Sequence, residues 1–245
     1  MWCKTGAFLL LAVVMSSAVW ADSSERRLSQ RATFVGMPFV WVPEGCFTVS
    51  LLSRGQFRET SAATEQCVTG FWLGESEVTQ AQWKAVMGAN PSHFSACGDH
   101  CPVEQVSWFD VQDFIAKLNT KRQGKFSLPD EIQWEYACRS GGKEHAYSGG
   151  DAPRLVAWYD GSWIRGSTRL VAQKKPNALG LYDMNGNVWE WVRSQPRVKP
   201  GLDKRQTNRG GSWLSHVKAV RCQQSNQFGS VGRDRGLGLR LLREK

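Results

Sequence analysis

Two histidines and two cysteines lie close together in the segment HFSACGDHC, as His93, Cys97, His100 and Cys101. Imidazole and thiolate groups bind zinc and copper in proteins, so this spacing is compatible with a metal site. The two cysteines can instead form a disulfide across a tight loop, as cysteines do in an oxidising compartment. The compartment therefore decides between the two interpretations.

The first residues have the layout of a secretory signal peptide. Lys4 precedes an apolar run over residues 7–15, and the segment SSAVWA follows it. This layout predicts cleavage before Asp22, so residues 1–21 are interpreted as a signal peptide. The run is too short to span a bilayer as a helix, and no other long apolar stretch follows. We therefore expect a periplasmic or secreted protein with no membrane span.

Cleavage would remove Cys3, one of seven cysteines, and leave an even number. An even count in an exported protein favours disulfides over a metal site, also for the CGDHC loop. The cysteines then divide into Cys97 with Cys101 in the tight loop, Cys46 with Cys67 beside a long hairpin, and Cys138 and Cys222, which remain for a third pair.

Composition limits the classes of protein that need to be considered. Hydrophobic residues make up 41% and charged residues 22%, which excludes disordered, collagen-like and coiled-coil chains. The 12 Trp and 24 Gly indicate a loop-rich fold packed by large rings. The net charge of +9 permits anionic partners. The basic residues are scattered, without the interleaved aromatics of single-strand nucleic-acid binders, so nucleic acid is not expected as a partner.

Strands and helices are expected mainly in the first half of the chain. Dense β-branched and aromatic residues predict strands over residues 34–42, 46–51 and 67–73. Residues 22–33 are expected to be a flexible lead-in, and residues 34–245 a single domain.

Three helices are predicted from capping residues and periodicity. Thr79 and Gln82 form a capping box for a helix over residues 80–87. A second helix begins at Ser107, and a third has Pro129 in its first turn. The second helix has apolar residues at i, i+3, i+4 and i+7 along one face. These are Val111, Phe114, Ile115 and Leu118.

Several longer segments occur in an order that points to a family. They read GFWLGESEVTQAQW, CPVEQVSWFDVQDFIAKLN, FSLPDEIQWEYACRSGG, KKPNALGLYDMNGNVWEWV and NRGGSWL, followed by GLGLRLL. Over residues 34–243 the chain resembles the sulfatase-modifying-factor domain of formylglycine-generating enzymes and their relatives. The resemblance implies an α+β fold, a loop-rich variant of the C-type lectin fold with short sheets and two to three helices.

The residues expected to bind copper in such enzymes differ here. In members that form formylglycine, the segment after GGS and an aromatic residue carries two cysteines, five residues apart, that bind copper(I). Here Ser215 occupies the first position, and the second position is Val220 or lies in a shortened loop. A serine hydroxyl is too hard a ligand to replace a thiolate on copper(I). Copper is therefore not expected as a cofactor, nor copper-dependent formylglycine formation as the activity.

The resemblance places other residues at the rim of the family's cleft. Ser212, Ser215 and His216 are the candidate catalytic positions. Trp213, Trp189 and Arg221 are the candidate ligand-binding positions.

A calcium site is expected in the turn NGNVWEW. Asn187, the carbonyl of Val188 and Glu190 offer hard oxygen ligands close together, and the family often binds calcium here. An alternative is that Asn187 and Glu190 only form hydrogen bonds within the loop.

Two functions of different class remain open, because a fold does not determine an activity. The first is an exported enzyme or maturation factor that uses the family cleft without copper. The second is a non-catalytic, C-type-lectin-like module that binds a ligand, including the variable protein of a diversity-generating retroelement. The partner is an unidentified protein or small molecule in both cases.

Overall fold

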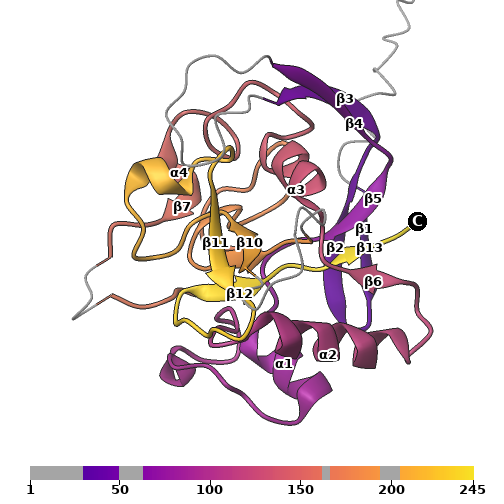
Figure 1. Ribbon diagram of the computed structural model, residues 1–245, viewed down its shortest axis with the longest axis vertical. Helices are drawn as coiled ribbons and strands as arrows, with labels where there is room; N and C mark the ends of the chain where they lie inside the picture. Colours follow the sequence, from indigo (N-terminus) through magenta and orange to yellow (C-terminus); the bar gives the residue numbers. More distant parts are fainter. Residues whose placement is uncertain (1–29, 50–62, 162–165, 194–204) are drawn as a thin grey trace, which may run out of the picture.

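The computed structural model describes residues 30–49, 63–161, 166–193 and 205–245 (Figure 1). The predicted signal peptide lies outside the described residues. Five strands form the larger sheet, all antiparallel, and the C-terminal strand pairs inside it. In spatial order they are β1 (Arg31–Phe34), β2 (Met37–Val42), β5 (Phe71–Gly74), β13 (Leu242–Arg243) and β6 (Phe126–Ser127).

The first expected strand, over residues 34–42, is in fact a hairpin. Val35 and Gly36 have φ values of 49° and 78°, so they form a tight turn between β1 and β2. Two left-handed residues match the twist of the flanking strands, which is why they are frequent in two-residue hairpin loops. Because β1 already begins at Arg31, the last part of the expected lead-in belongs to the sheet.

The strand predicted over residues 46–51 pairs in a hairpin with a strand that ends inside the third predicted one. β3 (Gly45–Val49) pairs with β4 (Thr64–Val68), and Cys46 lies directly opposite Cys67. These two cysteines form a disulfide, as predicted. The third predicted strand is split, because β4 ends at Val68 and β5 begins at Phe71.

The predicted helices are confirmed with one shift at an N-terminus. α1 (Gln80–Met87) and α2 (Trp108–Asn119) begin with the capping boxes of Thr79 and Ser107. α3 (Glu131–Cys138) is capped by Asp130, so Pro129 lies outside it. The remaining helical segments are single turns. They are α4 (Pro153–Val156) and the 3₁₀ turns η2 (Ser95–Cys97) and η3 (Val217–Val220).

The predicted apolar face of α2 packs into the core. Val111, Phe114, Ile115 and Leu118 are buried, and the Phe114 ring stacks on Trp83 of α1 at 4.7 Å between centroids. The two helices lie together at the lower end of the molecule in Figure 1. No helix of the described residues is long and apolar enough to cross a membrane.

A second sheet is built from the C-terminal third of the chain. Its strands, in spatial order, are β11 (Ser225–Gly229), β10 (Arg205–Arg209), β9 (Trp189–Trp191) and β12 (Leu237–Leu239). β12 runs parallel to β9, and the other pairs are antiparallel. A parallel two-stranded ladder, β7 (Ala157–Trp158) with β8 (Asn185–Gly186), lies before β9. Only glycine fits at position 186, because a Cβ there would lie 2.0 Å from the Trp158 carbonyl oxygen.

The other two expected disulfides are also confirmed. Cys97 bonds Cys101, which decides the HFSACGDHC segment in favour of a disulfide loop. Cys138 at the end of α3 bonds Cys222, so the third pair is formed by the two remaining cysteines. These pairs, the short sheets and the irregular connections confirm the expected loop-rich α+β class.

A buried ion pair joins the two sheets and α3. Arg240 lies between β12 and β13 and is fully buried, and its Nη2 lies 2.8 Å from Glu190 Oε1 in β9. Its Nη1 donates to the carbonyl of Gly74 in β5 at 2.9 Å. The other carboxylate oxygen of Glu190 accepts from Trp134 Nε1 in α3 at 2.6 Å. One guanidinium and one carboxylate therefore hold three elements together.

Arg240→Met should lower the free energy of unfolding by about 3–5 kcal/mol, because Glu190 would remain buried without its counter-ion. Urea unfolding followed by tryptophan fluorescence measures the loss. Adding Glu190→Gln to the same chain should recover part of it, since no unpaired charge is then left inside. A loss below about 1 kcal/mol in the single variant would contradict this role.

Candidate functional site

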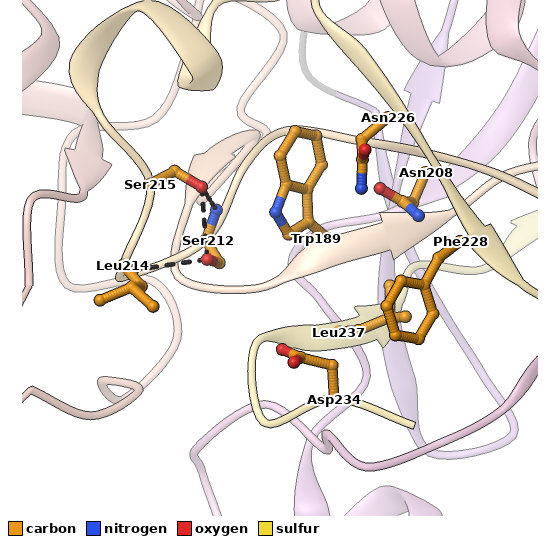
Figure 2. Close-up of a pocket in the computed structure, with 9 residues that line it drawn as sticks. All are labelled: Trp189, Asn208, Ser212, Leu214, Ser215, Asn226, Phe228, Asp234 and Leu237. Carbon is orange, nitrogen blue, oxygen red and sulfur yellow. Dashed lines mark hydrogen bonds between the residues drawn. The ribbon is translucent and has the colours of Figure 1, made fainter. Parts of the chain in front are cut away.

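A pocket of about 240 Å³ opens on one face of the second sheet (Figure 2). Polar and apolar side chains share its lining. They are Trp189, Asn208, Ser212, Leu214, Ser215, Asn226, Phe228, Asp234 and Leu237. Strands β9 to β12 supply the floor, and the segments around 212–215 and 234 supply the rim.

The pocket brings together three of the six cleft residues expected from the sequence. Trp189, Ser212 and Ser215 line it. Trp213 does not, because it is 3% exposed and its indole Nε1 donates to the carbonyl of Arg235 at 3.2 Å. Its ring meets Phe94 edge-on at 5.4 Å, so Trp213 packs beneath the rim.

The other two expected residues also lie outside the pocket lining. His216 is exposed and caps η3, with Nδ1 accepting from the Lys218 amide at 3.4 Å. Arg221 is half-buried, and its Nε donates to the Tyr147 hydroxyl at 3.5 Å. Their side chains are therefore engaged in local structure.

The two serines at the rim bond to each other. The Ser212 amide donates to Ser215 Oγ at 2.9 Å, and the two hydroxyl oxygens lie 3.3 Å apart. A nucleophilic serine needs a neighbouring base to take its proton. Within the described part of the chain, no histidine or carboxylate is hydrogen-bonded to either hydroxyl. The arrangement is that of a serine-closed turn.

Six of the nine lining residues were not predicted as site residues, and Asn208 is the most deeply buried polar one among them. It is 1% exposed, and neither Nδ2 nor Oδ1 has a hydrogen-bond partner among the residues that the structure describes. Asn226 lies opposite it in the β10–β11 register. Alternation along RQTNR, which puts Gln206 and Asn208 on one face, is the only signal in the sequence that could have found it.

Comparison with known proteins now identifies the family. Residues 25–245 match the family described as sulfatase-modifying factor enzyme 1-like domain. The chain belongs to the sulfatase-modifying-factor family. The resemblance seen in the sequence is thereby confirmed over nearly the whole chain.

Individual relatives span several functions. The chain is 31% identical to the chaperone protein LppX of Paenibacillus barcinonensis, over 97% of this chain and 98% of that protein. It is 32% identical to the formylglycine-generating enzyme of Streptomyces coelicolor, over 67% of this chain and 59% of the enzyme. Among solved structures, Treponema denticola variable protein 1 superposes with a TM-score of 0.72 at 26% identity, over 89% of this chain and 99% of that one.

Within the described residues, no free thiol lies near the pocket of this family member. Ser215 is the residue at the first expected copper position, and Val220, at the second, is buried. Cys222 is fully buried and bonded to Cys138. All six cysteines in the described ranges are in disulfides.

The turn expected to bind calcium is held by hydrogen bonds to two other segments of the chain. Asn187 Oδ1 accepts from the Arg169 amide at 2.9 Å, and its Nδ2 donates to Glu77 Oε2 at 3.1 Å. The amide of Val188 donates to the other oxygen of Glu77 at 3.3 Å. Burial, followed by the charges of Asp183 and Glu190, raises the pKa of Glu77 well above its ordinary value.

Asp183 lies just before this turn, and one of its carboxylate oxygens is not hydrogen-bonded to any described residue. Its Oδ2 accepts from the Ala172 amide at 2.6 Å, whereas Oδ1 is buried and has no hydrogen-bond partner in the described ranges. Three buried carboxyl groups therefore share one guanidinium, that of Arg240. They belong to Glu77, Asp183 and Glu190. The described residues contain no group of three or more His, Cys, Asp or Glu arranged to hold a metal ion.

A further buried carboxyl group, that of Glu104, lies in another part of the fold. Glu104 is fully buried, and its Oε1 accepts from the Phe94 amide at 2.8 Å. Its Oε2 has no partner among the described residues. Burial raises the pKa of Glu104 to about 7, although the amides of Phe94 and His93 act in the opposite direction.

This pKa makes stability depend on pH. Because the pKa of Glu104 rises from 4.5 to about 7 on folding, the folded protein keeps a proton that the unfolded chain releases. Stability should therefore fall as pH rises through that window. Glu104→Gln should remove this pH dependence. At about pH 8 its free energy of unfolding, measured by urea unfolding, should exceed that of the parent by up to about 3 kcal/mol. Parallel pH profiles of the two proteins would contradict the assignment.

Proposed function

We propose that this protein is an exported maturation factor that binds a partner in the family cleft and does not oxidise cysteine with copper. The observation that carries the proposal is Ser215, whose hydroxyl stands at the first copper position and is bonded to Ser212. The match to a chaperone protein along nearly the full length of both chains supports a binding role.

The donor set argues against a copper site in the cleft. Copper(I) is selected by soft thiolates, and a serine hydroxyl is hard and titrates far above neutral pH. Cys222 cannot approach as a thiolate while it is bonded to Cys138. The residues present therefore do not fit copper(I).

The pocket lining supports binding instead. Trp189, Phe228 and Leu237 offer apolar surface, and Asn208, Asn226 and Asp234 offer a few polar groups. Apolar walls with a small number of polar groups are typical of ligand sites. The absence of a base beside Ser212 and Ser215, among the residues described, disfavours serine nucleophilic catalysis.

Export is part of the proposal. Three disulfides are stable in an oxidising compartment, and they support a periplasmic or secreted location. The signal-peptide layout of residues 1–21 gives independent support from the sequence.

A formylglycine assay tests the copper-free assignment. Purified protein with copper(I), oxygen and a sulfatase-type cysteine peptide should give no formylglycine by mass spectrometry. Ser215→Cys should not restore turnover, because one thiolate does not make a two-thiolate site. The Streptomyces coelicolor enzyme under the same conditions is the positive control. Product from the unaltered protein would overturn the assignment.

The same preparation tests the binding role. Reduced, denatured lysozyme is the client probe, and an equimolar amount of the protein should lower its light scattering on dilution. Trp189→Ala should weaken the effect by removing an aromatic wall of the pocket. Leu170→Ala, at an exposed apolar residue outside the pocket lining, is the matched control and should change nothing. Equal protection by both variants would remove the pocket from the proposal.

A calcium ion is proposed at the segment 183–190, with Asp183 as a ligand. Its unpartnered oxygen is hard and buried beside two other carboxylates, which suits calcium. The Val188 carbonyl would add a second ligand, whereas the Asn187 amide and both oxygens of Glu190, the other two residues expected from the sequence, are already hydrogen-bonded. When bound, the ion would supply positive charge that balances these carboxylates.

Calcium should then stabilise the folded protein by linkage, by about 2.7 kcal/mol at a hundredfold excess over its Kd. We expect the melting temperature to fall when a chelator replaces calcium. Asp183→Asn should lose this calcium dependence, because the amide keeps the shape but not the charge. If the melting temperature of the unaltered protein is the same with and without the chelator, the site is ruled out.

A ligand-binding variable protein is the second candidate. Eight of the nine pocket residues lie between positions 208 and 237, near the C-terminus, and Treponema denticola variable protein 1 shares the fold. A near-repeat of the gene's 3′ end beside a reverse transcriptase gene would favour this function over the first.

A further inference from the structure

Asn208 is the residue of the pocket lining whose side-chain polar atoms are buried and unpaired within the described residues. Both Nδ2 and Oδ1 are enclosed, and both lack a hydrogen-bond partner within the described part of the chain. Leaving one buried polar group unpaired costs about 1–3 kcal/mol, so buried side-chain amides normally have partners. No described residue supplies a partner for this amide, and because Asn208 lines the pocket, a group bound there can supply one.

The two faces of β10 differ in a way that supports this. Thr207 and Arg209 point to the opposite face, where Thr207 Oγ1 donates to Glu131 and Arg209 Nη2 donates to Glu135 Oε2 at 2.7 Å. Asn208 points to the pocket face, beside Asn226 (Figure 2). On the pocket face both polar atoms of Asn208 lack a partner among the described residues, whereas on the opposite face only Arg209 Nε does.

The surroundings of Asn208 select a small, flat and uncharged group. Figure 2 shows its amide beside Asn226, on the side of the pocket where Trp189 and Phe228 also lie. Aromatic faces favour flat groups, and about 240 Å³ is room for a small ring or a single side chain. Asp234 is the only charged residue among the described residues of the lining, and its negative charge disfavours an anion.

We propose that the pocket binds a primary carboxamide through Asn208. Nδ2 donates to the carbonyl oxygen of the ligand, and Oδ1 accepts from its NH₂ group, so one flat pair of amides satisfies both buried atoms. A carboxylate offers no donor to Oδ1, and an ammonium group offers no acceptor to Nδ2. The inference rests on the proposed binding role of the cleft and names the group that it recognises.

Benzamide is the probe, because it joins a carboxamide to a flat ring. In ¹⁵N–¹H spectra of the full mature protein, benzamide should shift the Asn208 side-chain NH₂ signals and saturate. Benzoate has the same ring without the donor, and it should bind at least about tenfold more weakly, since one lost hydrogen bond with charge repulsion is worth about 1.4 kcal/mol or more. Equal binding of the two probes would overturn the proposal.

Two variants separate recognition from folding. Asn208→Leu should weaken benzamide at least about tenfold while keeping or raising the melting temperature, because it replaces an unpaired buried amide with an apolar group of similar size. Asn208→Asp keeps the shape and removes the donors, so it should also lose benzamide. A Leu variant that unfolds, with an Asp variant that still binds benzamide, would make Asn208 a structural residue and sink the proposal.

Peptides distinguish the two sources of a carboxamide. A short peptide with one Gln and a copy with Glu, both ending in an N-methylamide, differ only in that group. Selective binding of the Gln peptide assigns the site to a side chain of a polypeptide, and binding of benzamide alone assigns it to a small molecule. If neither binds, the carboxamide inference fails, whereas the copper-free assignment is decided separately by the formylglycine assay.

Discussion

The buried pair of Arg240 and Glu190 is the interaction on which the arrangement of the two sheets depends. Arg240 contacts the larger sheet through the Gly74 carbonyl and the smaller one through Glu190. A charge inside a protein is tolerated only when its partners are fixed, because an unpaired ion would lose its hydration without compensation. The pair therefore fixes the position of β9, and with it Trp189, the floor residue of the pocket.

The rim of the pocket is fixed by covalent and local bonds rather than by regular structure. Cys138 and Cys222 join α3 to the segment that follows η3, and Ser212 and Ser215 close the turn before it. Such constraints replace the ladders that a loop-rich chain lacks. The disulfide also uses Cys222, the only cysteine of this segment. Because a bonded cysteine is not a thiolate, the residue that stabilises the rim cannot also bind a metal in the pocket.

The sequence predicted local features well because they depend on neighbours along the chain. The capping boxes of Thr79 and Ser107 and the apolar face of α2 each lie within one or two helical turns. The hairpin at Val35 was missed because left-handed φ values at a β-branched residue are rare, so its side chain indicated a continuous strand. The pocket was predicted in part, through Trp189, Ser212 and Ser215. Asn208 was missed because its isolation depends on which face of β10 meets the rim.

The two unpaired carboxyl oxygens and the unpaired amide described above have one physical feature in common. Asp183 Oδ1, Glu104 Oε2 and both polar atoms of Asn208 are buried without partners in the described residues. Each unpaired group lowers the free energy of unfolding, which is small in any folded protein. Such groups are therefore expected to persist only where they serve a purpose. The carboxyl groups can be relieved by a proton or a cation, and the raised pKa of Glu104 is such a relief. A neutral amide has neither route, because it does not titrate and binds cations weakly. Of the three, Asn208 is therefore the group that neither a proton nor a cation can relieve, and a ligand with a donor and an acceptor of its own meets both of its needs.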